Sequence, residues 1–93
     1  MSEVRDNPAA SRFETTGGGG TAFVECRRAG ERIVLLHTEV PEALSGQGVG
    51  SKLVRGTLDI LRAEGAKVVP RCDFVAAYVE RHPEYRDLLD DGG

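Results

Sequence analysis

Ser45-Gly46-Gln47-Gly48-Val49-Gly50-Ser51-Lys52 is the stretch that decides the fold of this chain. It stands between an apolar run at residues 33–36 and an amphipathic segment that extends to Glu64. Three glycines at alternating positions permit positive φ angles and let a ligand approach the backbone closely. A helix that starts directly after them presents unpaired N–H groups and the positive end of its dipole. The stretch therefore predicts a strand, a glycine turn and a helix N-terminus that binds an anion, most simply a phosphate.

The length and composition of the chain limit what it can do. A chain of 93 residues has room for one modest core, so we expect residues 1–93 to form a single domain. Hydrophobic residues make up 40% and charged residues 29%, which is typical of a globular protein in water. The net charge is −3 and no Lys/Arg run is interleaved with aromatic residues, which argues against nucleic-acid binding.

Three further features concern the compartment and possible metal ligands. No segment approaches the roughly 18 apolar residues of a membrane span, and residues 1–10 lack the apolar core of a signal peptide. Cys26 and Cys72, without an export signal, are expected to be free thiols. His37 and His82 lack metal-ligand spacing, so no metal site is expected. We therefore expect a cytoplasmic protein without a membrane partner, either a monomer or a weak dimer.

Hydrophobic periodicity predicts strands on the N-terminal side of the glycine turn. Residues 21–27 alternate between apolar and polar and predict a strand, and residues 12–15 are a candidate for an earlier one. The four glycines at 17–20 predict a loop between them. Ala29-Gly30 is a turn signal, so the run 32–40 is expected to pair with the preceding strand as a hairpin. Four consecutive apolar residues in this run favour a central strand covered on both faces.

The segment after the turn predicts a strand between two helices. The expected elements are a helix from residue 49 to a stop at Gly65, a strand at 67–69 ended by Pro70, a helix at 74–80 with Asp73 as N-cap, a further turn at 84–89 and a disordered tail at 90–93. Antiparallel strands followed by such a β-α-β-α unit predict an α+β fold. Helices then pack on a mixed sheet whose last connection is a parallel crossover.

The order of these elements, together with four short motifs, resembles the Gcn5-related N-acetyltransferases (GNAT). The motifs are His37-Thr38-Glu39-Val40-Pro41, Gly46-Gln47-Gly48-Val49-Gly50-Ser51-Lys52-Leu53, Val69-Pro70-x-Cys72-x-Phe74-Val75 and Arg81-His82-Pro83-Glu84-Tyr85. Their order over residues 13–89 is similar to that of the small, stand-alone, single-domain members of the family. Two departures from the larger enzymes stand out. Ser45 occupies a position where those enzymes carry Arg or Gln, and the helical pair that walls their acceptor site has no counterpart.

The resemblance implies acetyl-CoA as co-substrate and places its binding residues. Backbone amides of the glycine turn would hold the pyrophosphate, Ser51 and Lys52 would lie near phosphate oxygens, and the main chain near Val40 would pair with the pantetheine arm as an added strand. The cofactor-binding residues are then Val40, Gly46, Gln47, Gly48, Val49, Gly50, Ser51 and Lys52.

Four side chains are candidates for the catalytic groups. Cys72, at the mouth of the expected site, is either an acyl-accepting nucleophile or a proton relay, or else a buried small hydrophobe. Tyr78 corresponds to a tyrosine that protonates the departing CoA thiolate in larger acetyltransferases, or it packs in the core. His37 and Glu39 are two residues apart on one strand and share a face, either as a general base or as a pair that supports the sheet.

The sequence thus predicts an enzyme that transfers acetyl from acetyl-CoA to a primary amine. The acceptor is a small amine, a polyamine, a protein lysine or an N-terminus. Two alternatives stay open: a module that binds CoA with little catalysis, and a small interaction protein whose glycine turn is only architectural.

Overall fold

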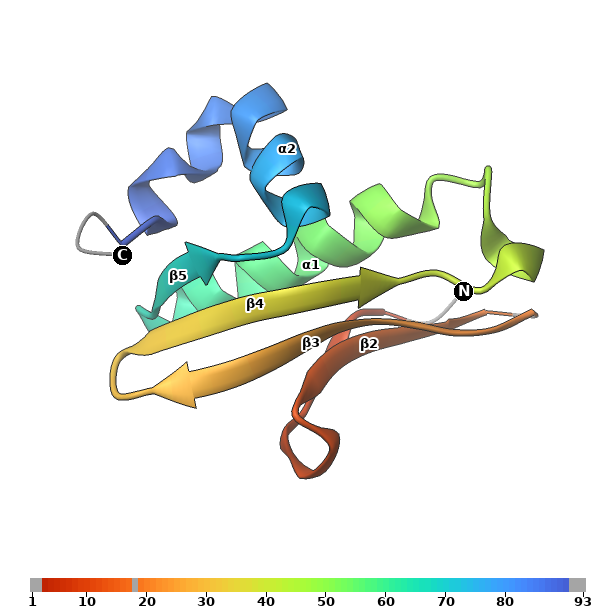
Figure 1. The fold of residues 1–93 in the computed structure, drawn as a ribbon, viewed down its shortest axis with the longest axis horizontal. Helices are drawn as coiled ribbons and strands as arrows, with labels where there is room; N and C mark the ends of the chain where they lie inside the picture. Colours follow the sequence, from red (N-terminus) through yellow and green to blue (C-terminus); the bar gives the residue numbers. More distant parts are fainter. Residues whose placement is uncertain (1–2, 18, 91–93) are drawn as a thin grey trace.

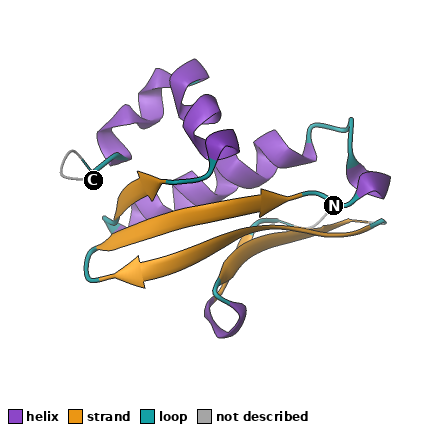
Figure 2. Cartoon of the chain, in the orientation of Figure 1, coloured by secondary structure: helices purple, strands orange, loops and turns teal. Residues whose placement is uncertain are grey.

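A five-stranded sheet with helices on one of its faces makes up the computed structural model, which describes residues 3–17 and 19–90 (Figures 1 and 2). The elements are, in chain order, β1 (Arg5–Asn7), the 3-10 turn η1 (Pro8–Ala10), β2 (Arg12–Gly17), β3 (Gly20–Ala29), β4 (Arg32–Glu39), the 3-10 turn η2 (Glu42–Leu44), α1 (Val49–Glu64), β5 (Lys67–Pro70), α2 (Asp73–Arg81) and the 3-10 helix η3 (Pro83–Leu88). The expected α+β class is confirmed.

The sheet is mixed, and its strands lie in the order β1-β2-β3-β4-β5. Strands β1 to β4 pair antiparallel in sequence, whereas β4 and β5 pair parallel from Arg32↔Lys67 to Leu35↔Pro70. The parallel pair needs a crossover, and α1 supplies it. The glycine turn at residues 45–48 therefore lies between the end of β4 and the start of α1, as the sequence predicts.

Helix α1 holds the core together by covering one face of the sheet (Figure 1). Its buried residues are Val49, Leu53, Val54, Thr57, Leu58 and Leu61. They belong to the same cluster as buried strand residues such as Phe13, Val24, Ile33, Leu35 and Val68. Gly65 ends the helix in the left-handed region, with φ of 73°, as expected for a C-terminal stop. In the described part of the chain, no helix has the length and apolarity that crossing a bilayer requires, and the cytoplasmic location stays a prediction.

The prediction that β4 is covered on both faces is wrong. Leu36 is 42% exposed, and His37 and Glu39 beyond it are exposed as well. The reason is that α2 lies beside α1 at the β5 edge, so the other face of the described sheet carries no helix (Figure 1). A run of apolar residues does not distinguish a strand covered on both faces from a strand that contains an irregularity.

The sequence analysis does not predict one of the strands, and two smaller expectations need correction. Residues 5–7 form an edge strand, β1, which is too short to show periodicity in the sequence. Asp73 is the first residue of α2, and the N-cap position belongs to Cys72, without a side-chain cap. Asp90, expected in a disordered tail, donates its N–H to the Val68 carbonyl at 3.0 Å and pairs with Arg32. The rest of that tail, 91–93, lies outside the described residues.

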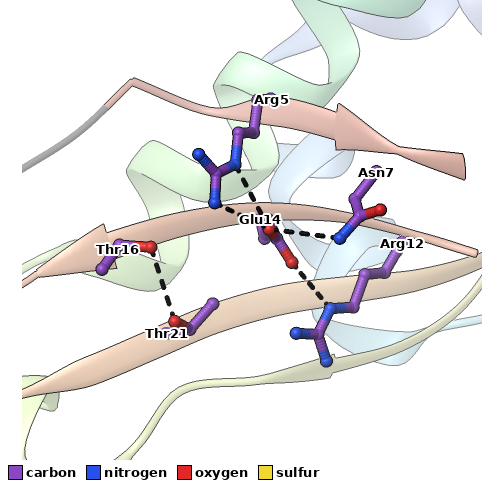
Figure 3. A network of polar contacts seen from close by, with 6 residues as sticks. All are labelled: Arg5, Asn7, Arg12, Glu14, Thr16 and Thr21. Atoms are coloured by element: carbon purple, nitrogen blue, oxygen red, sulfur yellow. Dashed lines mark hydrogen bonds and ion pairs between the residues drawn. The ribbon is translucent and has the colours of Figure 1, made fainter. Parts of the chain in front are cut away.

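On the face without helices, a buried carboxylate ties the two strands β1 and β2 together (Figure 3). Glu14 in β2 is 4% exposed and accepts hydrogen bonds from Arg12 at 2.8 Å and from Arg5 at 3.0 and 3.2 Å. Asn7 donates a further bond at 3.3 Å. The Arg12 guanidinium, which also stacks over Phe23 at 4.5 Å, is the main reason why the pKa of Glu14 lies below its ordinary value of 4.5. The network therefore fastens the edge strand β1 to β2.

We predict that Glu14→Gln destabilises the fold by about 1 kcal/mol at neutral pH, because the ionised partner of two guanidinium groups is lost. A carboxyl group with a lowered folded-state pKa stabilises above its unfolded pKa, and that contribution disappears as the pH falls through the folded pKa. Denaturant titration should therefore show the difference at pH 7, and the difference should shrink as the pH falls through the folded-state pKa of Glu14. The exposed Glu31→Gln serves as a control without a side-chain partner to lose. Equal effects of the two substitutions would contradict the network's role.

Candidate functional site

The site is centred where β4 and β5 separate. Their pairing ends at Leu35↔Pro70, where Cys72 donates its N–H to the Leu35 carbonyl at 2.9 Å and the chain turns into α2. Strand β4 continues to Glu39 with only β3 beside it. An edge of β4 is therefore left without a strand partner in the described residues, and backbone groups on such an edge can pair with an extended ligand.

A β-bulge lies at the same place. Glu25 faces His37 and Cys26 faces Leu35, so Leu36 is an extra residue in β4. The extra residue bends the strand and reverses the alternation of its side chains. After the bulge Thr38, which lies opposite Val24, shares the face covered by α1. His37 and Glu39 consequently lie on the open face.

The glycine turn has the backbone geometry that the sequence predicts. Gly46 and Gly48 have φ angles of 78° and 74°, in the left-handed region that disfavours other residues. A Cβ atom added at either glycine would meet nothing within 4 Å, so both Cα atoms face open space. Gly48 is the N-cap of α1, with no side-chain cap and no acidic residue in the first turn. The positive end of the helix is therefore left uncompensated by the chain itself.

Residues around the turn fix its position. Ser45 Oγ donates to the Glu42 carbonyl at 2.9 Å, and Leu44 in η2 is buried. The tip of the β2–β3 hairpin packs against η2 so closely that a Cβ atom at Gly19 would lie 2.6 Å from the Ala43 Cβ. The prediction of a loop over residues 17–20 is wrong at its two ends, because Gly17 and Gly20 pair as the last residue of β2 and the first of β3. Residue 18 lies outside the described residues, and Gly19 contacts η2 and so supports the turn.

A cavity of about 260 Å³ connects the end of β4 with the turn. It is lined by Val40, Leu44, Ser45, Gly46, Gly48, Val49, Gly50, Ser51 and Phe74. Phe74 from α2 is 44% exposed and lies against Gly50, where an added Cβ atom would be 2.7 Å from the ring. Seven of the eight predicted cofactor-binding positions line this cavity or the adjoining one described below; Gln47, whose Nε2 donates to the Ala43 carbonyl at 3.4 Å, lies in the same turn.

Cys72 and Thr38 form a pair next to the point where β4 and β5 separate. Their Sγ and Oγ1 atoms are 3.2 Å apart, and Cys72 is 8% exposed. Thr38 is a residue that the sequence analysis missed, although its place between His37 and Glu39 would have marked it as the side chain facing the other way. Cys26, the second free thiol, lies in the core, where burial raises its pKa.

His37 and Glu39 come together on the open face of β4, as their spacing predicts. His37 Nε2 lies 3.6 Å from Glu39 Oε1, and the two side chains are 56% and 60% exposed. Neither is a buried support for the sheet. The described structure places nothing over them, so a second molecule can reach both.

Tyr78 lies apart from the other three candidates. Its ring stacks on His82 with centroids 4.0 Å apart, and both residues line a groove beside Lys52 and Arg55. Burial is the main cause of a raised pKa for Tyr78. The structure thus groups Cys72 with Thr38, and His37 with Glu39, whereas Tyr78 belongs to the outer side of the α1–α2 pair.

Comparisons with known proteins bear on the family and the fold of this chain. A family model described as GCN5-related N-acetyl-transferase matches residues 12–88. Protein NATD1 of Homo sapiens and of Gallus gallus is 40% identical to the chain over 55 residues, 58% of this chain and 49% and 50% of those proteins. Protein NATD1 of Danio rerio is 32% identical over 57 residues, 59% of this chain and 52% of that protein. The match thus spans about half the length of these curated relatives.

The fold has a counterpart among solved structures. The solution structure of a GCN5-like protein from Staphylococcus aureus superimposes with a TM-score of 0.71 at 25% identity, over 95% of this chain and 87% of that one. The family model extends from β2 to the end of η3 and so includes the turn, the parting of the strands and both helices. The chain belongs to the GCN5-related N-acetyltransferase family.

Proposed function

We propose that the protein binds acetyl-CoA and transfers its acetyl group to a primary amine. The observation that carries the proposal is the position of the glycine turn. It opens α1 at the end of an unpaired edge of β4, in a chain whose family is acetyltransferase. An anion site and a strand edge for an extended arm are thereby adjacent, and CoA has a pyrophosphate and an extended pantetheine in that order.

The pyrophosphate is held mainly by backbone groups. The first intrahelical bond of α1 runs from Lys52 N–H to the Gly48 carbonyl at 3.1 Å, so the N–H groups of Val49, Gly50 and Ser51 have no acceptor within the helix. Helix N-termini of this kind bind phosphate through N–H groups and the helix dipole together. Lys52 adds the nearest full positive charge.

The pantetheine arm follows the free edge of β4. Val40 and Phe74 line the cavity between the turn and the parting of the strands, so an arm that starts at the turn reaches this edge across an apolar surface. Main-chain hydrogen bonds along residues 36–40 would then hold it as an added strand. The thioester arrives next to the Cys72–Thr38 pair.

The chemistry assigned to this place is direct attack by the amine. The amine nitrogen bonds to the thioester carbon, and the carbon–sulfur bond breaks with its electron pair going to the CoA sulfur. The ammonium proton goes to the His37–Glu39 pair, directly or through water, and the CoA thiolate takes a proton from the Cys72 thiol, which regains one from solvent. Cys72 relays that proton in this scheme. Its side-chain partner is the Thr38 hydroxyl, which is no base at neutral pH, so an acyl-accepting thiolate has no activator there.

An open acceptor face favours one alternative, a CoA-binding module with little catalysis. His37 and Glu39 are more than half exposed, and no described element encloses an acceptor beside them. A bound amine would be positioned weakly there, unless the acceptor is a macromolecule that supplies its own contact surface.

The first prediction from the proposed function is that acetyl-CoA and CoA raise the melting temperature of the protein. A ligand present at a hundred times its dissociation constant stabilises the folded state by about 2.7 kcal/mol. ADP, which offers only the pyrophosphate and adenosine, should give a smaller shift at the same concentration. The absence of a shift with all three compounds would refute both CoA-based functions and leave an architectural glycine turn.

The second prediction is that Gly48→Val abolishes acetyl-CoA binding in calorimetry while the protein still folds. A side chain at this φ angle costs about 1–2 kcal/mol of stability, and it projects into the space assigned to the phosphate. Gly30→Val is a matched control, because Gly30 has φ of 66° and open space around its Cα at the opposite end of β4. Unchanged affinity in Gly48→Val would place the pyrophosphate elsewhere.

The third prediction concerns Cys72. Mass spectrometry after incubation with acetyl-CoA should find no acetyl group on Cys72, and acetylated product should form only when an amine such as a polyamine or a lysine peptide is added. Cys72→Ala should lower kcat by about a hundredfold at unchanged acetyl-CoA affinity if the thiol relays the proton. An acetyl-Cys72 adduct that chases into product would replace direct attack by a covalent route, and full activity of Cys72→Ala would remove the residue from the mechanism.

A further inference from the structure

A second cavity adjoins the glycine turn on the outer side of the helices. It has a volume of about 400 Å³ and is lined by Gly48, Ser51, Lys52, Arg55, Tyr78 and His82. Gly48 and Ser51 also line the cavity at the end of β4, so the two spaces meet at the start of α1. We refer to this second cavity as the outer groove.

The outer groove is basic, and its cations are uncommitted. Lys52 and Arg55 are exposed on successive turns of α1, and neither forms an ion pair with another described residue. Elsewhere on the described surface, Arg28 and Arg62 are bound to carboxylates. Arg81 of α2 lines a smaller hollow of about 130 Å³ that shares Ser51 and Tyr78 with the groove. Although the net charge of the chain is −3, the positive charges of Lys52 and Arg55 lie without ion-pair partners among the described residues, beside the proposed anion site.

Tyr78 and His82 stack on each other along the groove, and Asp59, one turn after Arg55 on α1, has a hydrogen-bond partner of its own. His82 Nδ1 is hydrogen bonded to the Tyr78 carbonyl at 2.9 Å, and the two rings stack with an interplanar angle of 15°. Asp59 accepts a hydrogen bond from the Tyr85 hydroxyl at 2.7 Å. Burial and this bond raise the pKa of Tyr85 to about 12, so that it stays a donor at neutral pH.

We propose that the outer groove binds the 3′-phosphate of CoA and lets the protein distinguish CoA from dephospho-CoA. This inference rests on the proposed function, because it takes the pyrophosphate on the glycine turn as its anchor. From that anchor one end of the ligand enters the cavity at β4, and the ribose end enters the groove. A phosphate monoester has nearly two negative charges at neutral pH, which suits a lysine and an arginine held one helical turn apart.

The 3′-phosphate is the one group that separates the two ligands, so comparing them isolates the groove. Calorimetry should give a dissociation constant for CoA on the order of tenfold lower than that for dephospho-CoA with the unaltered protein. In the double variant Lys52→Gln/Arg55→Gln this ratio should fall to about twofold or less, even if both ligands bind more weakly. Arg27→Gln, which removes one exposed positive charge on the face without helices, is the control and should keep the full ratio.

The outcomes separate this inference from the proposed function. If both ligands bind the unaltered protein equally well, the CoA function stands and the role of the groove is refuted. A preference for CoA that persists in the double variant also refutes it, because the phosphate is then recognised elsewhere. If neither ligand binds, the proposed function fails and the inference fails with it.

Discussion

The early end of the β4–β5 pairing is the constraint on which the rest of the site depends. β5 follows β4 only as far as Leu35, where the Cys72 N–H closes the ladder, while β4 continues to Glu39 beside β3 alone. α2 must then leave the sheet, and the space between it and β4 becomes the cavity at the start of α1. Burial of the apolar stripe of α1 fixes that start, because sliding the helix would expose Leu53, Leu58 and their neighbours. Sheet and helix packing thus locate the proposed anion site and an open strand edge side by side.

Electrostatic asymmetry distinguishes this end of the molecule. Several charged side chains elsewhere are paired, as in the Glu14 network that joins β1 to β2. At the start of α1 the chain supplies neither a capping side chain nor an acidic residue, and Lys52 and Arg55 lie beside it without partners. A folded chain that leaves a helix dipole and two cations uncompensated forgoes stability there, since an acid in the first turn contributes about 0.3–1 kcal/mol. Such a cost is expected where binding an anion replaces the missing interactions.

The candidate catalytic groups lie on two faces of one strand, which constrains the chemistry. His37 and Glu39 face the side without helices, whereas Thr38 contacts Cys72 on the covered side. A ligand along the unpaired edge of β4 would lie between the His37–Glu39 pair and the Thr38–Cys72 pair. In the proposed binding mode, a thioester along that edge would be open to an amine on the His37–Glu39 side and would have Cys72 on the other side. This division supports the proposed direct transfer, with proton removal and leaving-group protonation on opposite sides of the strand.

The sequence by itself determined the order of elements from β2 onward, the glycine turn and its conformation. Each of these rests on local physics: the stripe of α1 repeats at helical spacing, and positive φ at Gly46 and Gly48 requires glycine. Only the tertiary structure decided which faces the site residues occupy. Strict alternation from Ile33 and Leu35 would put His37 and Glu39 on the helix side, and the bulge at Leu36 turns them outward and Thr38 inward. A bulge depends on pairing with a distant strand, and the approach of Tyr78 and His82 to Arg55 depends on packing between two helices. Interactions between residues far apart in the chain leave no periodic pattern in the sequence. The outer groove could therefore not be predicted from the sequence and is visible only in the tertiary structure.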